Sequence, residues 1–217
     1  MPEATQKREK YYPVEDSQLA GMNTSMVGDK AYGAGVEARD SKSVYDNKET
    51  EPEFALKVAL LLKDSLLKKG YRVVMSRTDD SQNISNGARS ALAGETSDIM
   101  ISIHSNTGNN SGTLVFYPGD KDYISEGVYP GYTKIMGITD ENINNSKKLA
   151  ENMAKNIPAL TGLKNKGVHT AVLRIFSYSS IPTCLVEVGF ADNIDDAKIL
   201  GTKKELIAEA MLNSIEE

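Results

Sequence analysis

Hydrophobic residues recur with a helical period in the stretch that begins at Phe54. Apolar side chains fall mainly on one face of a helix drawn over residues 54–69, and lysines and an aspartate fall on the other. The pattern predicts an amphipathic helix. Gly70 ends it, since glycine readily adopts the positive φ found at helix C-termini. Residues 71–75 then read Tyr-Arg-Val-Val-Met, which predicts a strand.

Helical and extended patterns alternate through the rest of the chain. Further helices are predicted over 83–93 and 142–157, with one or two more between 193 and 216. Strands are predicted over 98–103, 112–117 and 182–188, and residues 166–175 form a loop or a short strand. The strands are apolar almost throughout, which is typical of strands covered on both faces. We therefore expect an α/β fold, with a mostly parallel central sheet flanked by helices on both faces.

Two stretches lack any sustained period. Residues 1–50 are polar, and residues 118–139 are rich in Gly, Pro and Tyr. Both are predicted to be long loops, the second an insertion on the surface. A chain of 217 residues suits one domain, so residues 1–217 are expected to form a single catalytic domain. A monomer is the default expectation.

Composition excludes several classes of partner. The net charge of −5 lacks the basic footprint of a nucleic-acid-binding protein. The longest apolar runs, such as 99–103, are far shorter than the ~20 residues that span a bilayer, and no secretory leader opens the chain. A single cysteine, Cys184, excludes an internal disulfide and is predicted to pack in the core.

His104 and Glu187 are candidates for chemistry. His104 ends the predicted strand 98–103, and binding sites in such folds form at the carboxyl ends of strands. Hydrogen bonding to a loop is the alternative role for it. Glu187 lies inside an apolar strand, and a buried carboxylate must meet a metal, a cation or a proton. The alternative for Glu187 is an ion pair with Arg77 or Arg89.

Other ionisable residues are less telling by themselves. Glu49, Glu51 and Glu53 precede the long helix, where acids stabilise a helix N-terminus, and this role is favoured for all three. His169 follows no apolar strand, so a solvated histidine is favoured there, with metal binding in reserve.

Together, these motifs resemble the zinc-dependent N-acetylmuramoyl-L-alanine amidases of the amidase-3 family, from about Glu51 to the C-terminus. Members share a glutamate that opens a long helix, a Gly-Tyr-x-Val stretch, an arginine helix, a Ser-Ile-His-x-Asn strand end, a Gly-Val turn and a Val-Glu-x-Gly-Phe-x-x-Asn strand. The matching residues are Glu51, 70–79, Arg89, 102–106, 167–168 and 186–193.

The resemblance implies a function and a set of roles. Glu51 and His104 correspond to two zinc ligands, with Glu53 as the alternate for Glu51, and Glu187 corresponds to the catalytic glutamate. Zinc-activated water would cleave the amide between N-acetylmuramic acid and L-alanine in peptidoglycan, with Glu187 as general base and acid. The location implied is extracellular or in the cell wall.

One departure from the family lies at the front of the sequence. Family members begin with an apolar strand that ends in another zinc-binding histidine, and residues 1–50 contain neither. We therefore expect the first strand to be missing, and with it the third ligand that catalytic zinc sites usually have. A catalytically impaired cell-wall-binding or regulatory module is the alternative function.

Overall fold

The computed structural model describes residues 49–79, 84–119, 138–171, 173–176 and 180–217, so most of both predicted loops lies outside the described part. Four strands form one sheet in the order β1-β4-β2-β3. β1 and β4 are parallel, as are β2 and β3, whereas β2 and β4 are antiparallel. The bounds are β1 Met100–Asn106, β2 Thr113–Pro118, β3 Asn165–Ala171 and β4 Thr183–Phe190.

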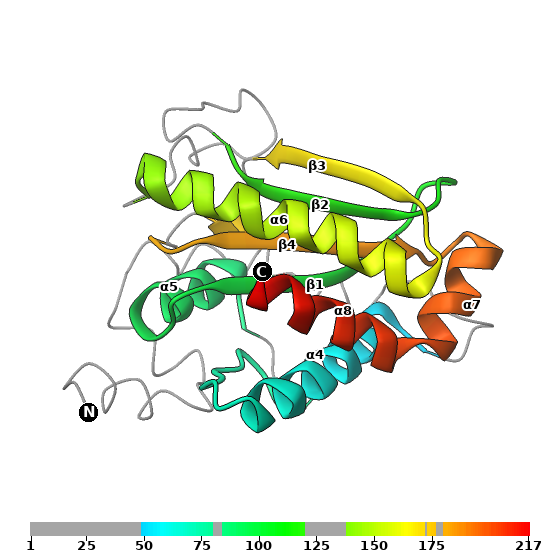
Figure 1. The fold of residues 1–217 in the computed structure, drawn as a ribbon, viewed down its shortest axis with the longest axis horizontal. Coiled ribbons are helices and arrows are strands. Elements are labelled where there is room, and N and C mark those ends of the chain that lie inside the picture. Colours follow the sequence, from blue (N-terminus) through cyan, green and yellow to red (C-terminus); the bar gives the residue numbers. More distant parts are fainter. Residues whose placement is uncertain (1–48, 80–83, 120–137, 172, 177–179) are drawn as a thin grey trace.

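Helices lie on both faces of this sheet, as Figure 1 shows. Helices α4, α6 and α8 pack over one face, while the 3-10 helix η3 packs near Leu185 on the other face and α5 contacts η3. The predicted α/β fold with a mostly parallel sheet is confirmed. The bounds are α4 Glu51–Lys68, α5 Asn86–Thr96, α6 Asp140–Thr161, η3 Arg174–Phe176, α7 Ile194–Thr202 and α8 Lys204–Glu216.

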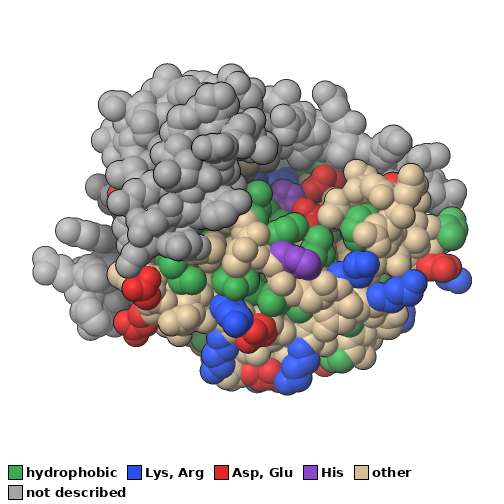
Figure 2. Space-filling view, turned by 90° about the horizontal axis from the view of Figure 1, so that it is seen from above, with side chains coloured by type: hydrophobic (Ala, Val, Ile, Leu, Met, Phe, Trp, Pro, Cys, Tyr) green, Lys and Arg blue, Asp and Glu red, His purple; other side chains and the backbone are tan. Residues whose placement is uncertain are grey.

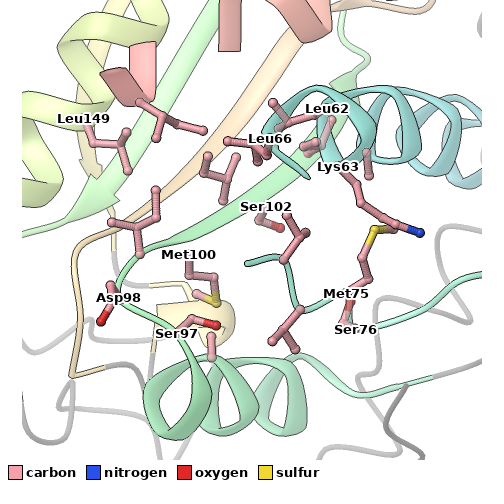
Figure 3. A pocket seen from close by; sticks show the side chains of 18 of the residues that line it. Leu62, Lys63, Leu66, Met75, Ser76, Ser97, Asp98, Met100, Ser102 and Leu149 are labelled. Carbon is pink, nitrogen blue, oxygen red and sulfur yellow. The ribbon is translucent and has the colours of Figure 1, made fainter. Parts of the chain in front are cut away.

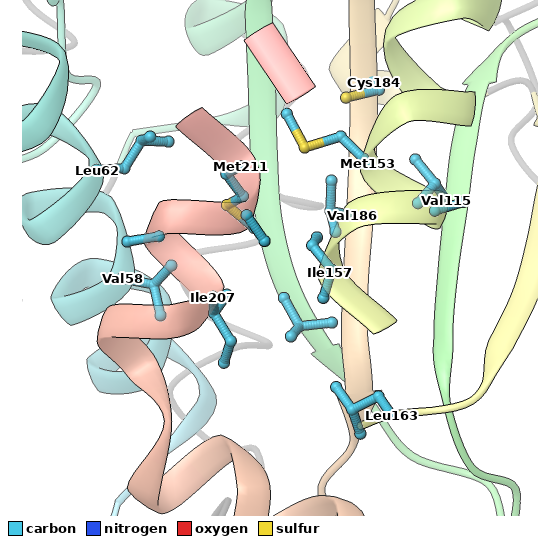
Figure 4. Close-up of a cluster of buried hydrophobic side chains, with 14 of the residues drawn as sticks. Val58, Leu62, Val115, Met153, Ile157, Leu163, Cys184, Val186, Ile207 and Met211 are labelled. Carbon is cyan, nitrogen blue, oxygen red and sulfur yellow. The ribbon is translucent and has the colours of Figure 1, made fainter. Parts of the chain in front are cut away.

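The main hydrophobic core lies between the sheet and helices α4, α6 and α8 (Figure 4). Val58 of α4, Met153 of α6 and Met211 of α8 meet Val186 of β4 there, each with no exposed surface. Cys184 is also fully buried, and burial raises the pKa of its thiol to about 12. This confirms its predicted packing role. None of the described helices is long and apolar enough to cross a membrane.

The prediction of a strand at residues 71–75 is wrong. These residues form neither helix nor strand, although they follow α4 directly, as predicted. A cavity of about 940 Å³ lies between them and β1, which is an edge strand of the described sheet. Figure 3 shows Met75 and Ser76 on one side of it and Met100 and Ser102 on the other. A strand needs a neighbour for its backbone hydrogen bonds, and across this cavity β1 cannot supply them.

Candidate active site

The register of the sheet brings two of the predicted site residues together. His104 of β1 is paired directly with Glu187 of the parallel strand β4. Neighbouring strands lie about 4.8 Å apart, and paired residues project from the same face, so these two side chains are neighbours. Both lie near the carboxyl ends of their strands, where the fold predicts a site.

The third predicted residue reaches the same point from a helix. Glu51 is the first residue of α4, and its Oε1 lies 2.7 Å from Nδ1 of His104. Ser102 lies two residues before His104 on β1, and its Oγ is 3.0 Å from Nε2 of the same ring. Both ring nitrogens therefore have partners, and Ser102 fixes the orientation in which Nδ1 faces Glu51.

Glu187 has an unusual environment for a carboxylate. Its Oε2 is buried and has no hydrogen-bond partner in the part of the chain that the structure describes. Burial raises the pKa of Glu187 to about 7; the charge of His104 opposes that rise and the charge of Glu51 adds to it. The alternative of an ion pair with Arg77 or Arg89 is not supported, because Oε2 of Glu187 has no partner among the described residues and neither arginine is among the groups that shift its pKa. Such a carboxyl group exchanges a proton near neutral pH.

The neighbouring acids have other partners. Glu53 accepts a hydrogen bond from the backbone N–H of Thr50 at 2.7 Å in a capping box, which lowers the pKa of its carboxyl group. Buried Glu49 is paired with Lys57 at 2.7 Å and with Lys204 at 2.9 Å. The helix-start role favoured for the acids therefore applies to Glu53, whereas Glu51 turns to His104.

His169 is not brought to this cluster. It is exposed on β3, and the sheet order places β4 and β2 between β3 and the strand that carries His104. Its imidazole Nε2 lies 3.2 Å from the carbonyl oxygen of Lys166, and its ring centroid lies 6.2 Å from that of Phe116. A shared metal site with Glu51 and His104 is therefore excluded by the topology.

The cluster fits a metal by the type of its donors. An imidazole nitrogen and carboxylate oxygens are ligands that zinc accepts, and the unpartnered oxygen of Glu187 suits a group that faces water beside a metal. Glu51 and His104 offer two ligands, and no group of three such side chains suited to a metal occurs among the described residues. The assigned roles stay predictions.

Two buried contacts near the site were not predicted from the sequence. Asp196 of α7 accepts hydrogen bonds from the backbone N–H groups of Gly112 at 2.7 Å and of Phe190 at 2.9 Å. It therefore joins the start of β2 to the end of β4. Its place in the first turn of a helix suggests only a favourable charge, and nothing in the local pattern indicates that it reaches Gly112, 84 residues earlier.

We expect the raised pKa of Glu187 to make stability depend on pH. In the unfolded chain its carboxyl group ionises near pH 4.5, but in the folded protein only near pH 7. Between pH 4.5 and pH 7 the folded state therefore holds a proton that the unfolded chain has lost. The free energy of unfolding falls as pH rises through this range, because deprotonation is easier in the unfolded chain. The full loss, reached above pH 7, is roughly 3 kcal/mol.

Chemical denaturation of the zinc-free wild type and of Glu187→Gln measures this effect. The amide cannot ionise, so relative to the wild type the variant should gain roughly 3 kcal/mol of unfolding free energy between pH 4.5 and pH 8. Titrating groups that do not interact with Glu187 cancel in the comparison. A difference between the two proteins that is constant with pH would show that the Glu187 pKa is ordinary.

The fold and the cluster together indicate a class of enzyme. An α/β sheet that presents a histidine and two carboxylates near its strand ends, one carboxyl group titrating near neutrality, is typical of a hydrolase that activates water. Comparison with known proteins gives the family. Residues 30–217 match the sequence profile of the amidase-3 family, described as N-acetylmuramoyl-L-alanine amidase, and the chain belongs to this family.

Individual relatives agree with this membership. The chain is 27% identical over 170 residues to the uncharacterized protein YqiI of Bacillus subtilis (strain 168), covering 76% of this chain and 73% of that one. It is 31% identical over 154 residues to the N-acetylmuramoyl-L-alanine amidase LytC of the same strain, covering 69% of this chain but 27% of LytC.

A solved structure shares the fold. The catalytic domain of CwlV, an N-acetylmuramoyl-L-alanine amidase from Bacillus (Paenibacillus) polymyxa var. colistinus, superposes with a TM-score of 0.65 at 23% identity, covering 82% of this chain and 90% of that one.

Proposed function

We propose that the protein is a peptidoglycan hydrolase that cleaves the amide bond between N-acetylmuramic acid and L-alanine. One observation carries the proposal: Glu187 combines a buried, unpartnered oxygen and a pKa of about 7 with a position directly beside His104. Membership of the amidase family indicates that the bond cleaved is this amide. Such a protein acts in the cell wall or outside the cell, and we expect it to act as a monomer.

Glu187 moves the protons of the reaction. In its ionised form the carboxylate takes a proton from a water molecule as the oxygen attacks the carbonyl carbon of the lactyl group. The carboxyl group then gives this proton to the nitrogen of L-alanine as the C–N bond breaks. A pKa near 7 suits both steps, because the group must accept and release a proton at the working pH.

Glu51 and His104 would hold the zinc ion. Bound zinc would supply a Lewis acid that polarises the amide carbonyl and makes a nearby water molecule more acidic. Ser102, at 3.0 Å from Nε2 of His104, keeps that nitrogen engaged, so Nδ1 is the ligand atom that faces Glu51. Partners of this kind fix the ring orientation of metal-binding histidines.

We further propose that the cavity beside β1 accepts an additional strand. One wall is formed by residues 98–104, which lead into β1 and form most of it, and the opposite wall is formed by residues 70–77. A strand there would satisfy the backbone of β1 and give residues 71–75 the partner that their sequence predicts. A strand that ends beside His104 would also place a third ligand at the metal site, as the family resemblance implies.

The test compares the 217-residue chain with one that carries the residues encoded immediately upstream of Met1. We expect the extended protein to bind about one zinc ion per chain and to unfold at a higher temperature, because a buried strand adds core and ligand together. Equal zinc content and equal melting temperature would contradict the additional strand. Equal and negligible zinc in both would favour the impaired cell-wall-binding module.

A further inference from the structure

The sheet face that carries Glu187 continues across β2 to β3. Pairing places Leu114 of β2 directly beside Glu187, and Phe116 of β2 beside both Leu185 of β4 and His169 of β3. Since residues two apart on a strand share a face, these side chains project from one surface. The opposite face of the sheet covers the main hydrophobic core, because Val115 and Val186 belong to that core and Val168 packs against it.

The part of this face near β3 carries exposed basic side chains. His169, Lys166 and Lys164 are exposed, and a Cβ atom added at Gly167 would meet nothing within 4 Å. Residues 162–171 contain these two lysines and the histidine but no Asp or Glu, although the chain as a whole has a net charge of −5. Figure 2 shows both histidines of the chain on one side of the molecule, with hydrophobic side chains between them.

We propose that Leu114, Phe116, His169 and Lys166 form a subsite for the stem peptide of the substrate. The subsite rests on the proposed function and extends it to the peptide side of the scissile bond. Leu114 and Phe116 are half-buried, with Phe116 packing partly against the cluster that contains Phe176, and their exposed parts contact the peptide. His169 and Lys166 bind a carboxylate on the peptide. Positive groups on an otherwise acidic protein favour an anionic ligand, and the stem peptide carries free carboxylates whereas the glycan hydroxyls are neutral.

Spacing sets the length of peptide required. The path from Glu187 to His169 crosses from β4 to β2 and from β2 to β3, and it moves two residues along β2, from Leu114 to Phe116. With the usual spacings between strands and between residues, the distance is about 12 Å. An extended peptide advances roughly 3.3 Å per residue, so the bound carboxylate belongs to the third or fourth residue after the cleaved amide. A muramyl compound with one amino acid cannot reach the subsite.

Lysines on an edge strand have another known use, which is to prevent pairing with other chains. The experiment separates the two roles with Lys166→Gln, His169→Ala and their double variant. Lys68→Gln is the matched control, because Lys68 is also exposed and lies on α4, which packs against β1 at the opposite edge of the sheet. Each protein, loaded with zinc, is assayed on muramyl-alanine and on the muramyl tetrapeptide with free or amidated carboxylates.

We expect the double variant to raise KM for the free tetrapeptide roughly five- to tenfold, with kcat almost unchanged, since contacts to a distant carboxylate bind ground state and transition state alike. With the amidated tetrapeptide, every protein, including the wild type, should show a KM about as high as that of the double variant with the free tetrapeptide. The KM for muramyl-alanine should be the same in all the proteins. An unchanged KM for the free tetrapeptide in the double variant, or an equal rise in the Lys68→Gln control, would overturn the subsite.

A binding measurement separates this proposal from the proposed function. Calorimetry measures the affinity of the Glu187→Gln protein for the free tetrapeptide that lacks the sugar. This measurement does not depend on cleavage of any bond. If Lys166→Gln or His169→Ala, added to the Glu187→Gln protein, weakens this binding, the subsite is supported even if none of the proteins hydrolyses an amide. Cleavage of muramyl tetrapeptide with equal KM in all variants would leave the amidase function standing and remove the subsite.

Discussion

Replacement of Glu187 by Gln is expected to reduce the rate of peptidoglycan hydrolysis by roughly 10²- to 10⁴-fold, the usual contribution of a positioned acid–base group. Gln has nearly the same size and shape as Glu but can neither accept the proton of the attacking water nor return it to the leaving amine. The side chain lies beside His104 and is half-buried, and Gln fills the same space, so the substitution changes charge without opening a cavity. Turbidity loss of a peptidoglycan suspension measures the rate.

The matched control is Glu53→Gln. Glu53 lies two residues from Glu51, but its carboxylate is held by Thr50 in the capping box of α4. We expect this variant to lose some helix stability, about 1 kcal/mol, and to keep most of its hydrolytic rate. A Glu187→Gln protein with more than about a tenth of the wild-type rate would show that another group moves the proton.

Loss of His104 or Glu51 is expected to cost most of the zinc affinity. Groups that merely orient a metal ligand contribute about 10- to 100-fold to metal affinity. Removal of a direct ligand by His104→Ala or Glu51→Ala should therefore weaken zinc binding by at least about 100-fold. Competition with a chromophoric chelator measures the dissociation constant in each protein, and circular dichroism checks that the fold is retained.

His169→Ala is the matched control for that measurement. It removes the other histidine of the chain from an exposed position on β3, from which the topology excludes it as a ligand beside His104. We expect its zinc affinity to equal that of the wild type. If His169→Ala weakened zinc binding as much as His104→Ala, the metal site would have to be sought elsewhere.

The sequence predicts the main elements, and it marks His104 and Glu187 as candidates, because these signals are local. The helical period from Phe54 predicts α4, and apolar runs ending at His104 and containing Glu187 predict β1 and β4. Residues 71–75 show the limit of such reasoning. Their composition favours a strand, but a strand also needs a partner, and the cavity beside β1 denies them one.

Contacts between distant segments were beyond local patterns. His169 offered no sign of its position, because only the pairing of β3 with β2 places it on the Glu187 face. The link of Asp196 to Gly112 joins residues 84 positions apart, and the hydrogen bond between Ser102 and His104 depends on a side-chain orientation that spacing alone does not fix. Glu51 was singled out from its acidic neighbours by the family resemblance, whereas its charge and place alone favoured a helix-start role.

The chemical ends formed in digested peptidoglycan test the central claim most directly. Zinc-loaded protein is incubated with purified peptidoglycan, and new amino termini and new reducing sugars are both quantified. We expect new amino termini on L-alanine, no increase in reducing sugars, and neither product with Glu187→Gln. New reducing ends, new amino termini on residues other than that alanine, or equal alanine release by Glu187→Gln would contradict an amidase centred on Glu51, His104 and Glu187.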